Sequence, residues 1–167
     1  MESGILQWPE WIIDKFPNGA TVGFDFTQYP AANLDARSKT MEEKKIQIKS
    51  VPNLVDLTWG QEKPARPNGE VKHLDLKFTG QETHDKYKTI TEKLAGNVDA
   101  LLVTTLDDIC WTLNLRGADI DYNPVFFSYL VLYPGEETKC TLYVDAAKVE
   151  GVKDYLHANK VTVVPYS

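Results

Sequence analysis

The sequence is poor in the residues that build metal and redox sites. It has two cysteines, Cys110 and Cys140, which lie thirty positions apart, and three histidines, His73, His84 and His157. Zinc binding through paired cysteines is therefore excluded. Each histidine is interpreted as structural, because no second titrating residue stands beside it in the sequence. With so few cysteines and no Asn-x-Ser/Thr sequon, a reducing, cytoplasmic setting is expected.

Long apolar runs and basic clusters are missing as well. No run approaches the roughly 20 residues that span a bilayer. A net charge of −6 without a basic cluster argues against nucleic acid and anionic membranes as partners. The start, MESGILQWPEW, lacks the basic region and apolar core of a signal peptide.

Catalytic signatures are also missing. The sequence has no Gly-x-Ser-x-Gly elbow, phosphate loop, Rossmann glycine fingerprint or His-Glu-x-x-His motif. The chain alone is therefore expected to be inactive as a hydrolase, because nothing in it supplies an activated nucleophile.

What is present is an alternation of helix and strand patterns. Residues 8–16 predict a helix, 20–26 a strand, 29–45 a helix and 46–51 a strand, and the proline- and glycine-containing segment 60–70 predicts a linker. Further on, the pattern predicts an extended segment at 73–80, a helix at 82–95 and a strand covered on both faces at 98–105. Strands at 125–133 and 139–145, joined by a hairpin, a helix at 146–159 and a strand at 160–166 follow. The expected fold is α/β, a mixed β-sheet flanked by helices.

The helix that starts after Thr105 has the clearest pattern. Thr105 is expected to cap it, and Gly117 is expected to be the left-handed residue that ends it. Its buried stripe is predicted to consist of Leu106, Ile109, Cys110 and Leu113.

A long stretch around this helix resembles a known family. LLVTTLDDICWTLNLRGADIDYNPVFFSYLVL (101–132) closely resembles the second domain of the cytosolic three-domain Xaa-Pro aminopeptidases, or aminopeptidase P. The family pattern there is Leu-Asp-Glu-Ile-Ala-Trp, Asn-Leu-Arg-Gly-Ser-Asp and Asn-Pro-Val-Phe-Phe-Ser-Tyr, and this chain departs from it at Asp108, Cys110 and Ala118. The segments 7–25, 53–67 and 161–167 are similar to further parts of the same family, so the resemblance covers nearly the whole chain.

The resemblance implies a creatinase N-terminal-like (ribonuclease H-like) fold and a larger parent enzyme. Residues 1–59 would be the C-terminal part of a truncated first domain, 60–72 a linker and 73–167 the second domain. In the family, a third, pita-bread domain carries two divalent metal ions, usually manganese, on side chains that have no counterpart here. The parent would be a metal-dependent hydrolase that removes an N-terminal residue preceding proline, with a metal-bridging hydroxide attacking the scissile carbonyl.

The resemblance also suggests where this region would act. The candidate residues of an active-site rim or interface are Arg116, Asp119, Tyr122, Asn123, Phe126 and Phe127. The expected partners are the protein's own catalytic domain and a peptide with proline at its second position, and a homodimer is left open.

Some of these residues could have a purely structural role instead. Arg116 could instead clamp Asp119 or bond carbonyls at the helix end, and strand alternation turns one phenylalanine to the core. The alternative for the whole chain is a stand-alone creatinase-like interaction module without peptidase activity.

Overall fold

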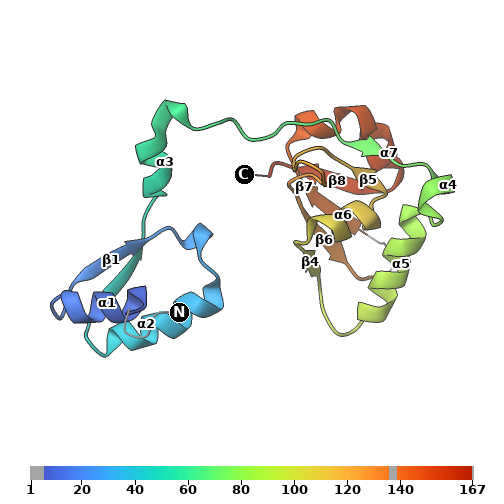
Figure 1. Cartoon of the computed structure of the whole chain (residues 1–167). Helices are drawn as coiled ribbons and strands as arrows, with labels where there is room; N and C mark the ends of the chain where they lie inside the picture. Colours follow the sequence, from blue (N-terminus) through green and yellow to red (C-terminus); the bar gives the residue numbers. More distant parts are fainter. Residues whose placement is uncertain (1–5, 136–138, 167) are drawn as a thin grey trace. The chain divides into compact units, whose positions relative to one another are not determined.

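The computed structural model describes residues 6–135 and 139–166, and its contacts divide the chain into two compact units (Figure 1). Unit 1 is Met1–Ala65 and unit 2 is Arg66–Ser167. The division between Ala65 and Arg66 falls inside the segment 60–72 that the sequence predicts to be a linker. No helix in the described ranges has the length and apolarity to cross a bilayer.

Unit 1 is built on a pair of parallel strands. Its elements are α1 (Trp8–Lys15), β1 (Thr21–Phe24), η1 (Phe26–Gln28), α2 (Ala31–Glu42), β2 (Gln47–Ser50), α3 (Leu54–Trp59) and η2 (Gly60–Glu62). β1 and β2 pair in parallel, with Val22 opposite Ile48. The interior is small: Met41 and Ile46 are the large apolar side chains that are fully buried among the described residues of this unit. The predicted helix–strand–helix–strand order is confirmed, with shorter elements than the sequence suggests.

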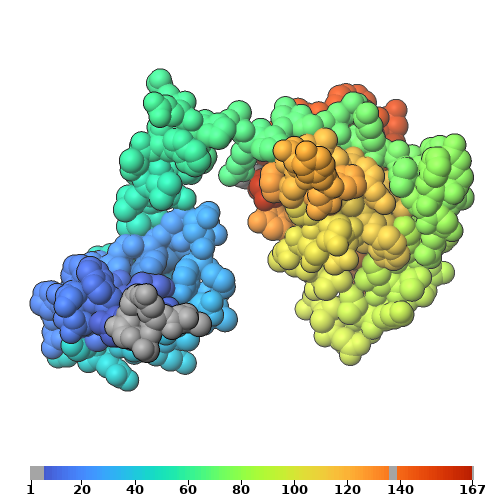
Figure 2. Space-filling view, viewed as in Figure 1, coloured from blue at the N-terminus to red at the C-terminus, as the bar shows by residue number. Residues whose placement is uncertain are grey.

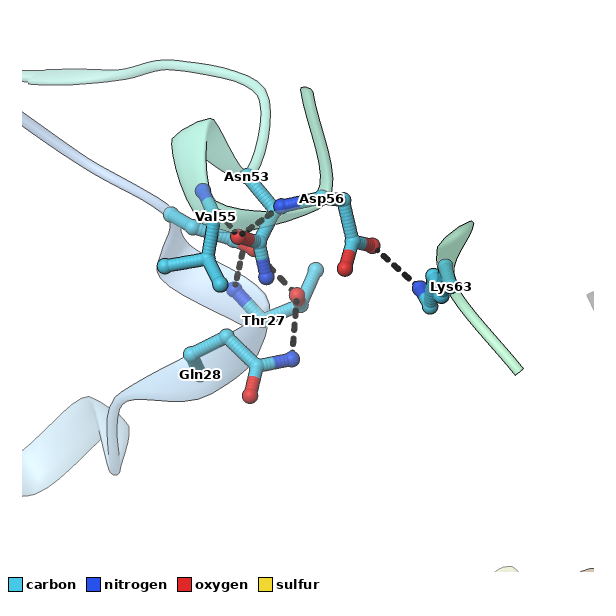
Figure 3. Close-up of polar contacts among 7 residues, drawn as sticks. Thr27, Gln28, Asn53, Val55, Asp56 and Lys63 are labelled. Carbon is cyan, nitrogen blue, oxygen red and sulfur yellow. Dashed lines mark hydrogen bonds and ion pairs between the residues drawn. The ribbon is translucent and has the colours of Figure 1, made fainter. Parts of the chain in front are cut away.

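Helix α3 is a local feature that the sequence pattern did not assign. Asn53 caps it, because its side-chain oxygen accepts hydrogen bonds from the backbone N–H groups of Val55 and Asp56, at 2.9 and 3.2 Å (Figure 3). Asp56 also pairs with Lys63 at 2.7 Å, which ties the helix to the chain that follows it (Figure 3). The apolar side chains of α3 remain largely exposed, with Leu57 67% accessible.

Unit 2 contains a four-stranded mixed sheet. Its elements are β3 (Lys72–His73), α4 (Leu76–Thr79), α5 (Thr83–Leu94), β4 (Leu101–Val103), α6 (Leu106–Thr112), β5 (Leu115–Arg116), β6 (Tyr129–Tyr133), β7 (Lys139–Tyr143), η3 (Ala146–Val152), α7 (Lys153–Ala158) and β8 (Val161–Val164). The strand order is β4-β6-β7-β8, with β7 and β8 parallel and the other pairs antiparallel. A separate antiparallel pair joins β3 to β5. The predicted mixed sheet with helices is confirmed; the predicted hairpin loop lies partly outside the described residues.

The register of this sheet explains its core. Paired positions place apolar side chains in rows across all four strands, one row being Val103, Leu130, Leu142 and Val163. Leu130 and Leu142 have no exposed surface. Side chains of α5, α6, η3 and α7 pack on the same core, namely Tyr87, Ile109, Cys110, Val149, Val152 and Leu156, together with Leu113 directly after α6. The core thus forms where the alternate apolar side chains of the strands pack against the apolar faces of the helices.

Two predictions about unit 2 were wrong. The segment 73–80 is not extended: only Lys72–His73 pair as a strand, and Leu76–Thr79 form a helical turn that ends at Gly80, where φ is +71°. The strand at 98–105 is not covered on both faces, because Leu101 and Val103 of β4 pack against the core whereas Leu102 is 60% exposed.

The ends of α6 also differ from expectation. Its buried residues Ile109 and Cys110 were predicted correctly, and Leu113 directly after the helix is buried as well. Thr105 is at the N-cap position, but its side chain makes no capping hydrogen bond. Asn114, with φ +52°, is the left-handed residue that follows the helix, whereas Gly117 serves a different purpose described below.

Candidate interaction site at the 116–127 loop

The predicted site residues lie on one loop that runs out from β5 and returns toward β6. The two arms of the loop are joined by backbone hydrogen bonds from Gly117 N–H to Pro124 O and from Asp119 N–H to Val125 O, both 3.1 Å. Gly117 is required here because a Cβ at this position would lie 2.5 Å from Cβ of Phe126. Close approach of the two arms, not a helix stop, explains this glycine. Figure 2 shows the amber and orange atoms of this part of the chain on the visible surface of unit 2.

Asp119 anchors the loop from inside. Its side chain has no exposed surface, and Oδ2 accepts hydrogen bonds from Lys148 Nζ at 2.5 Å and from the Phe127 N–H at 2.7 Å. Lys148 is itself 6% exposed. The carboxylate therefore connects the two arms of the loop to helix η3.

Arg116 bonds carbonyl oxygens near the end of α6, which is one of the two structural roles expected for it. Its Nη1 donates to Cys110 O at 3.2 Å and to Leu115 O at 2.7 Å. A second cation acts at the same helix end, since the buried Lys86 donates to Trp111 O at 2.9 Å and to Asn114 Oδ1 at 2.6 Å. Burial, and then the neighbouring Arg116 charge, lower the pKa of Lys86. Together the two cations satisfy carbonyls at the negative end of α6.

The tip of the loop, Ile120–Asn123, points into solvent. A β-bridge joins Ile120 and Asn123, and Asn123 N–H donates to Ile120 O at 3.1 Å. Tyr122 is fully exposed and has φ +63°, a conformation that is costly for a residue with a large side chain. An exposed aromatic ring held in a strained turn is unusual for a loop with a purely connecting role.

The two phenylalanines of the loop point in different directions. Phe126 has no exposed surface and belongs to the core of unit 2, so it supports the loop from below and is not itself a rim residue. Phe127 is half-buried and lines a pocket of about 410 Å³. The pocket is lined by Arg66, Pro67, Asn68, Phe127, Asp145, Ala146, Lys148, Pro165 and Tyr166. The expectation that one of the pair faces the core is met by Phe126.

Sequence reasoning missed several residues of this pocket. Arg66 lies 5.9 Å from the ring centroid of Tyr166, and Tyr166 stacks on Tyr129 with centroids 5.1 Å apart. Lys148 was missed because lysine in a predicted helix is usually solvent-exposed. One signal was available: in the α-helix that the sequence predicts at 146–159, Lys148 would share a face with Val152, four residues further on.

Among the described residues, the metal-ligating side chains are dispersed and the thiols are buried. Across residues 6–135 and 139–166, no group of three His, Cys, Asp or Glu side chains could hold a metal ion. Both cysteine thiols are buried, and burial raises the pKa of each. The tip and the pocket combine aromatic rings, prolines and an exposed arginine, a composition that is typical of binding surfaces.

Comparison with known proteins identifies the relatives of this chain. Residues 62–167 match the model of the Creatinase/Prolidase N-terminal domain. A probable Xaa-Pro aminopeptidase P from Pyricularia oryzae is 41% identical over 163 residues, which cover 95% of this chain and 26% of the relative. A probable Xaa-Pro aminopeptidase P from Laccaria bicolor is 35% identical and is matched over 99% of this chain and 26% of its own length.

A solved structure is similar as well. The crystal structure of X-prolyl aminopeptidase from Caenorhabditis elegans, described as a cytosolic enzyme with a di-nuclear active site, superposes with a TM-score of 0.84 at 31% sequence identity. The match covers 99% of this chain and 27% of the C. elegans chain. This chain therefore spans about a quarter of the length of the proteins it matches.

Proposed function

Because the chain belongs to the Creatinase/Prolidase N-terminal domain family, we propose that it is the non-catalytic N-terminal region of an Xaa-Pro aminopeptidase. The observation that carries the proposal is the extent of the similarity: 35–41% identity runs through both units, beyond the family domain itself. The complete protein would remove an N-terminal residue that precedes proline. It would use two divalent metal ions, with manganese as the proposed metal, and act in the cytoplasm.

The domain assignment is part of the same proposal. Residues 1–59 would be the C-terminal part of a first creatinase-like domain, 60–72 a linker, and 73–167 a second creatinase-like domain. The contacts separate the chain between Ala65 and Arg66, and the family model begins at residue 62, which supports a division in this region. The contacts also place 66–72, the second half of the proposed linker, in unit 2, where Val71 is buried in the core.

For the site, the role proposed is support of the catalytic domain or of substrate access. Tyr122 and Asn123 at the tip, with Phe127 in the pocket, would face the catalytic domain, whereas Arg116, Asp119 and Phe126 hold the loop from within. The exposure and strain of Tyr122 support this role, because a strained conformation persists where function or packing requires it. Aromatic side chains are also common at the energetic centre of interfaces.

The peptidase proposal is tested on the full-length protein. With Mn²⁺, it should release the first residue of an Xaa-Pro-Pro peptide, and chelation should stop the release. The isolated 167-residue chain should release nothing above the blank under the same conditions. A full-length protein that binds but does not cleave such peptides would instead support the stand-alone interaction module.

The site proposal is tested by Tyr122→Gly in the full-length protein. Glycine relieves the strain of a positive φ, so the melting temperature should be unchanged or higher. The peptidase kcat/KM should nevertheless fall. Lys160→Gly is the matched control, because Lys160 also has a positive φ, +56°, and is exposed in the same unit. Equal kcat/KM values for the two variants would refute a role for the tip.

A further inference from the structure

Lys148 lies where three segments of unit 2 meet. Its backbone carbonyl accepts a hydrogen bond from the Val71 N–H at 2.8 Å, and its Nζ binds Asp119 Oδ2 at 2.5 Å. The same Nζ lies 5.8 Å from the centroid of the Phe127 ring. Lys148 thus contacts three segments. These are the chain at Val71, which follows the Arg66–Asn68 wall of the pocket, the base of the tip at Asp119, and the pocket wall at Phe127.

The first two of these segments are also packed tightly on each other. A Cβ on Gly69 would lie 2.9 Å from Cβ of Ala118, the residue before Asp119. The chain at 66–71 and the base of the loop therefore cannot move independently without losing this contact. Lys148 bonds both segments next to this contact: its side chain bonds Asp119, and its carbonyl accepts from the Val71 N–H.

The burial of the Lys148–Asp119 pair indicates a role in geometry. Removing two opposite charges from water is costly, and apolar replacements of a buried ion pair are often neutral or stabilising. Surface pairs such as Lys153 with Glu150, close by on the same stretch of chain, carry no such cost. In unit 2 the pair joins specific elements, because the Asp119 carboxylate bonds both Lys148 Nζ on η3 and the Phe127 N–H on the returning arm.

The tip depends on that arrangement. Beyond Asp119, the backbone hydrogen bonds described for the tip are internal, from Asn123 N–H to Ile120 O and from Val125 N–H to Asn123 O. The tip side chains Ile120 and Tyr122 are exposed, 39% and fully. The direction in which the tip points is consequently set at its base, by the backbone hydrogen bonds between the two arms and by the Asp119 carboxylate with its partners.

We infer that Lys148 is a positioning residue, which fixes the Ile120–Asn123 tip relative to the pocket through Asp119. The functional part of this inference rests on the proposed function, since it presumes that tip and pocket present one surface to the catalytic domain. The effect of Lys148 is on the orientation of the tip, and a loss of orientation should weaken docking or substrate binding more than the chemical step.

The positioning can be measured without any catalytic activity. A nitroxide attached through Tyr122→Cys reports the mobility of the tip. Cys110 and Cys140 are buried, and reactive cysteines of the full-length protein outside this region are replaced before labelling. In the full-length protein, Lys148→Met should sharpen the spectrum of this nitroxide. Lys153→Met, which removes an exposed lysine from the same stretch of chain, should leave the spectrum unchanged.

A second variant guards against simple unfolding. Lys148→Met leaves a buried carboxylate without its cation, so it is expected to lower the melting temperature. Asp119→Asn combined with Lys148→Met removes both charges and should melt close to the parent while the nitroxide remains mobile. A folded double variant whose nitroxide is as immobile as in the parent would overturn the inference.

Peptidase kinetics then separate the inference from the proposed function. In the double variant, KM for an Xaa-Pro-Pro peptide should rise on the order of tenfold with kcat nearly constant, as expected when positioning is lost away from the reacting groups. Unchanged KM with a mobile tip would refute the functional part. Absence of activity in every form, parent included, would refute the proposed function, while the nitroxide result would still decide whether Lys148 orients the tip.

Discussion

Gly117→Ala is expected to destabilise unit 2 through one steric contact. The new methyl group would lie 2.5 Å from Cβ of Phe126 and 2.9 Å from the carbonyl oxygen of Val125. Neither neighbour can retreat easily, because Phe126 is fully buried and the two arms are joined by the Gly117–Pro124 hydrogen bond. Overpacking of this kind costs about 1–3 kcal/mol, and reduced flexibility of the unfolded chain offsets about 0.4–1 kcal/mol.

The net loss is then about 1–2 kcal/mol, which for a unit of about 100 residues lowers the melting temperature by roughly 5–15 °C. Urea and thermal unfolding measure this loss of stability. Amide exchange at Leu130 and Leu142, which lie in the sheet of unit 2, assigns the loss to that unit. Gly151→Ala is the matched control, because its Cβ would meet Oε1 of Glu70 at 2.7 Å, the movable end of a flexible side chain. If Gly117→Ala were no less stable than Gly151→Ala, the close approach of the two arms would not be a real constraint.

Three further predictions follow from the burial of single side chains. Phe126→Ala should cost about 3–5 kcal/mol of unfolding free energy, whereas Phe127→Ala, at a half-buried site, should cost roughly 1 kcal/mol; comparable losses in urea melts would contradict the division of roles. Burial raises the pKa of Cys140 to about 12, so at pH 8.5 a thiol reagent should modify it only after unfolding, as followed by mass spectrometry. The stability that this thiol contributes is present below its ordinary pKa of 9.0 and is lost as pH rises toward 12. For Lys86, whose folded pKa is lowered, the unfolded chain binds more protons between that lowered pKa and 10.5. Its contribution therefore makes stability rise with pH in that window, and Lys86→Met should remove this slope from urea midpoints.

Local patterns predicted what local physics decides. The stripe of Ile109, Cys110 and Leu113 is visible in the sequence, because a helix that packs on a sheet must present apolar residues at this spacing. The same holds for the alternation in β6 and β7, whose inward residues Leu130 and Leu142 form the core. These features depend on neighbours within a few residues along the chain.

The predictions that were wrong depended on distant neighbours. The segment 73–80 alternates like a strand, but β5 offers only two residues for pairing, so the chain turns into α4 instead. Whether Leu102 is covered depends on what lies against the outer face of the sheet, which its own apolar run does not reveal. Gly117 looked like a helix stop, and the reason for it is Phe126, nine residues away and on the returning arm.

The candidate site shows the same limit. The sequence identified the loop, and it suggested that Arg116 could bond carbonyl groups at the helix end. The structure shows such bonds. It did not identify the partner of Asp119, because Lys148 lies 29 residues further along and reaches the carboxylate only through the fold. The pocket is equally non-local, since it brings Arg66 and Tyr166 together from the two ends of unit 2.

The sparse interior of unit 1 affects how the isolated 167-residue chain will appear to a common optical probe. Trp8, Trp11 and Trp59 belong to unit 1, and only Trp111 belongs to unit 2. With two strands and so few buried apolar side chains, unit 1 should loosen first on heating. Indole fluorescence of the isolated 167-residue chain will therefore mainly follow its less stable unit, and an early spectral change will coincide with an intact four-stranded sheet.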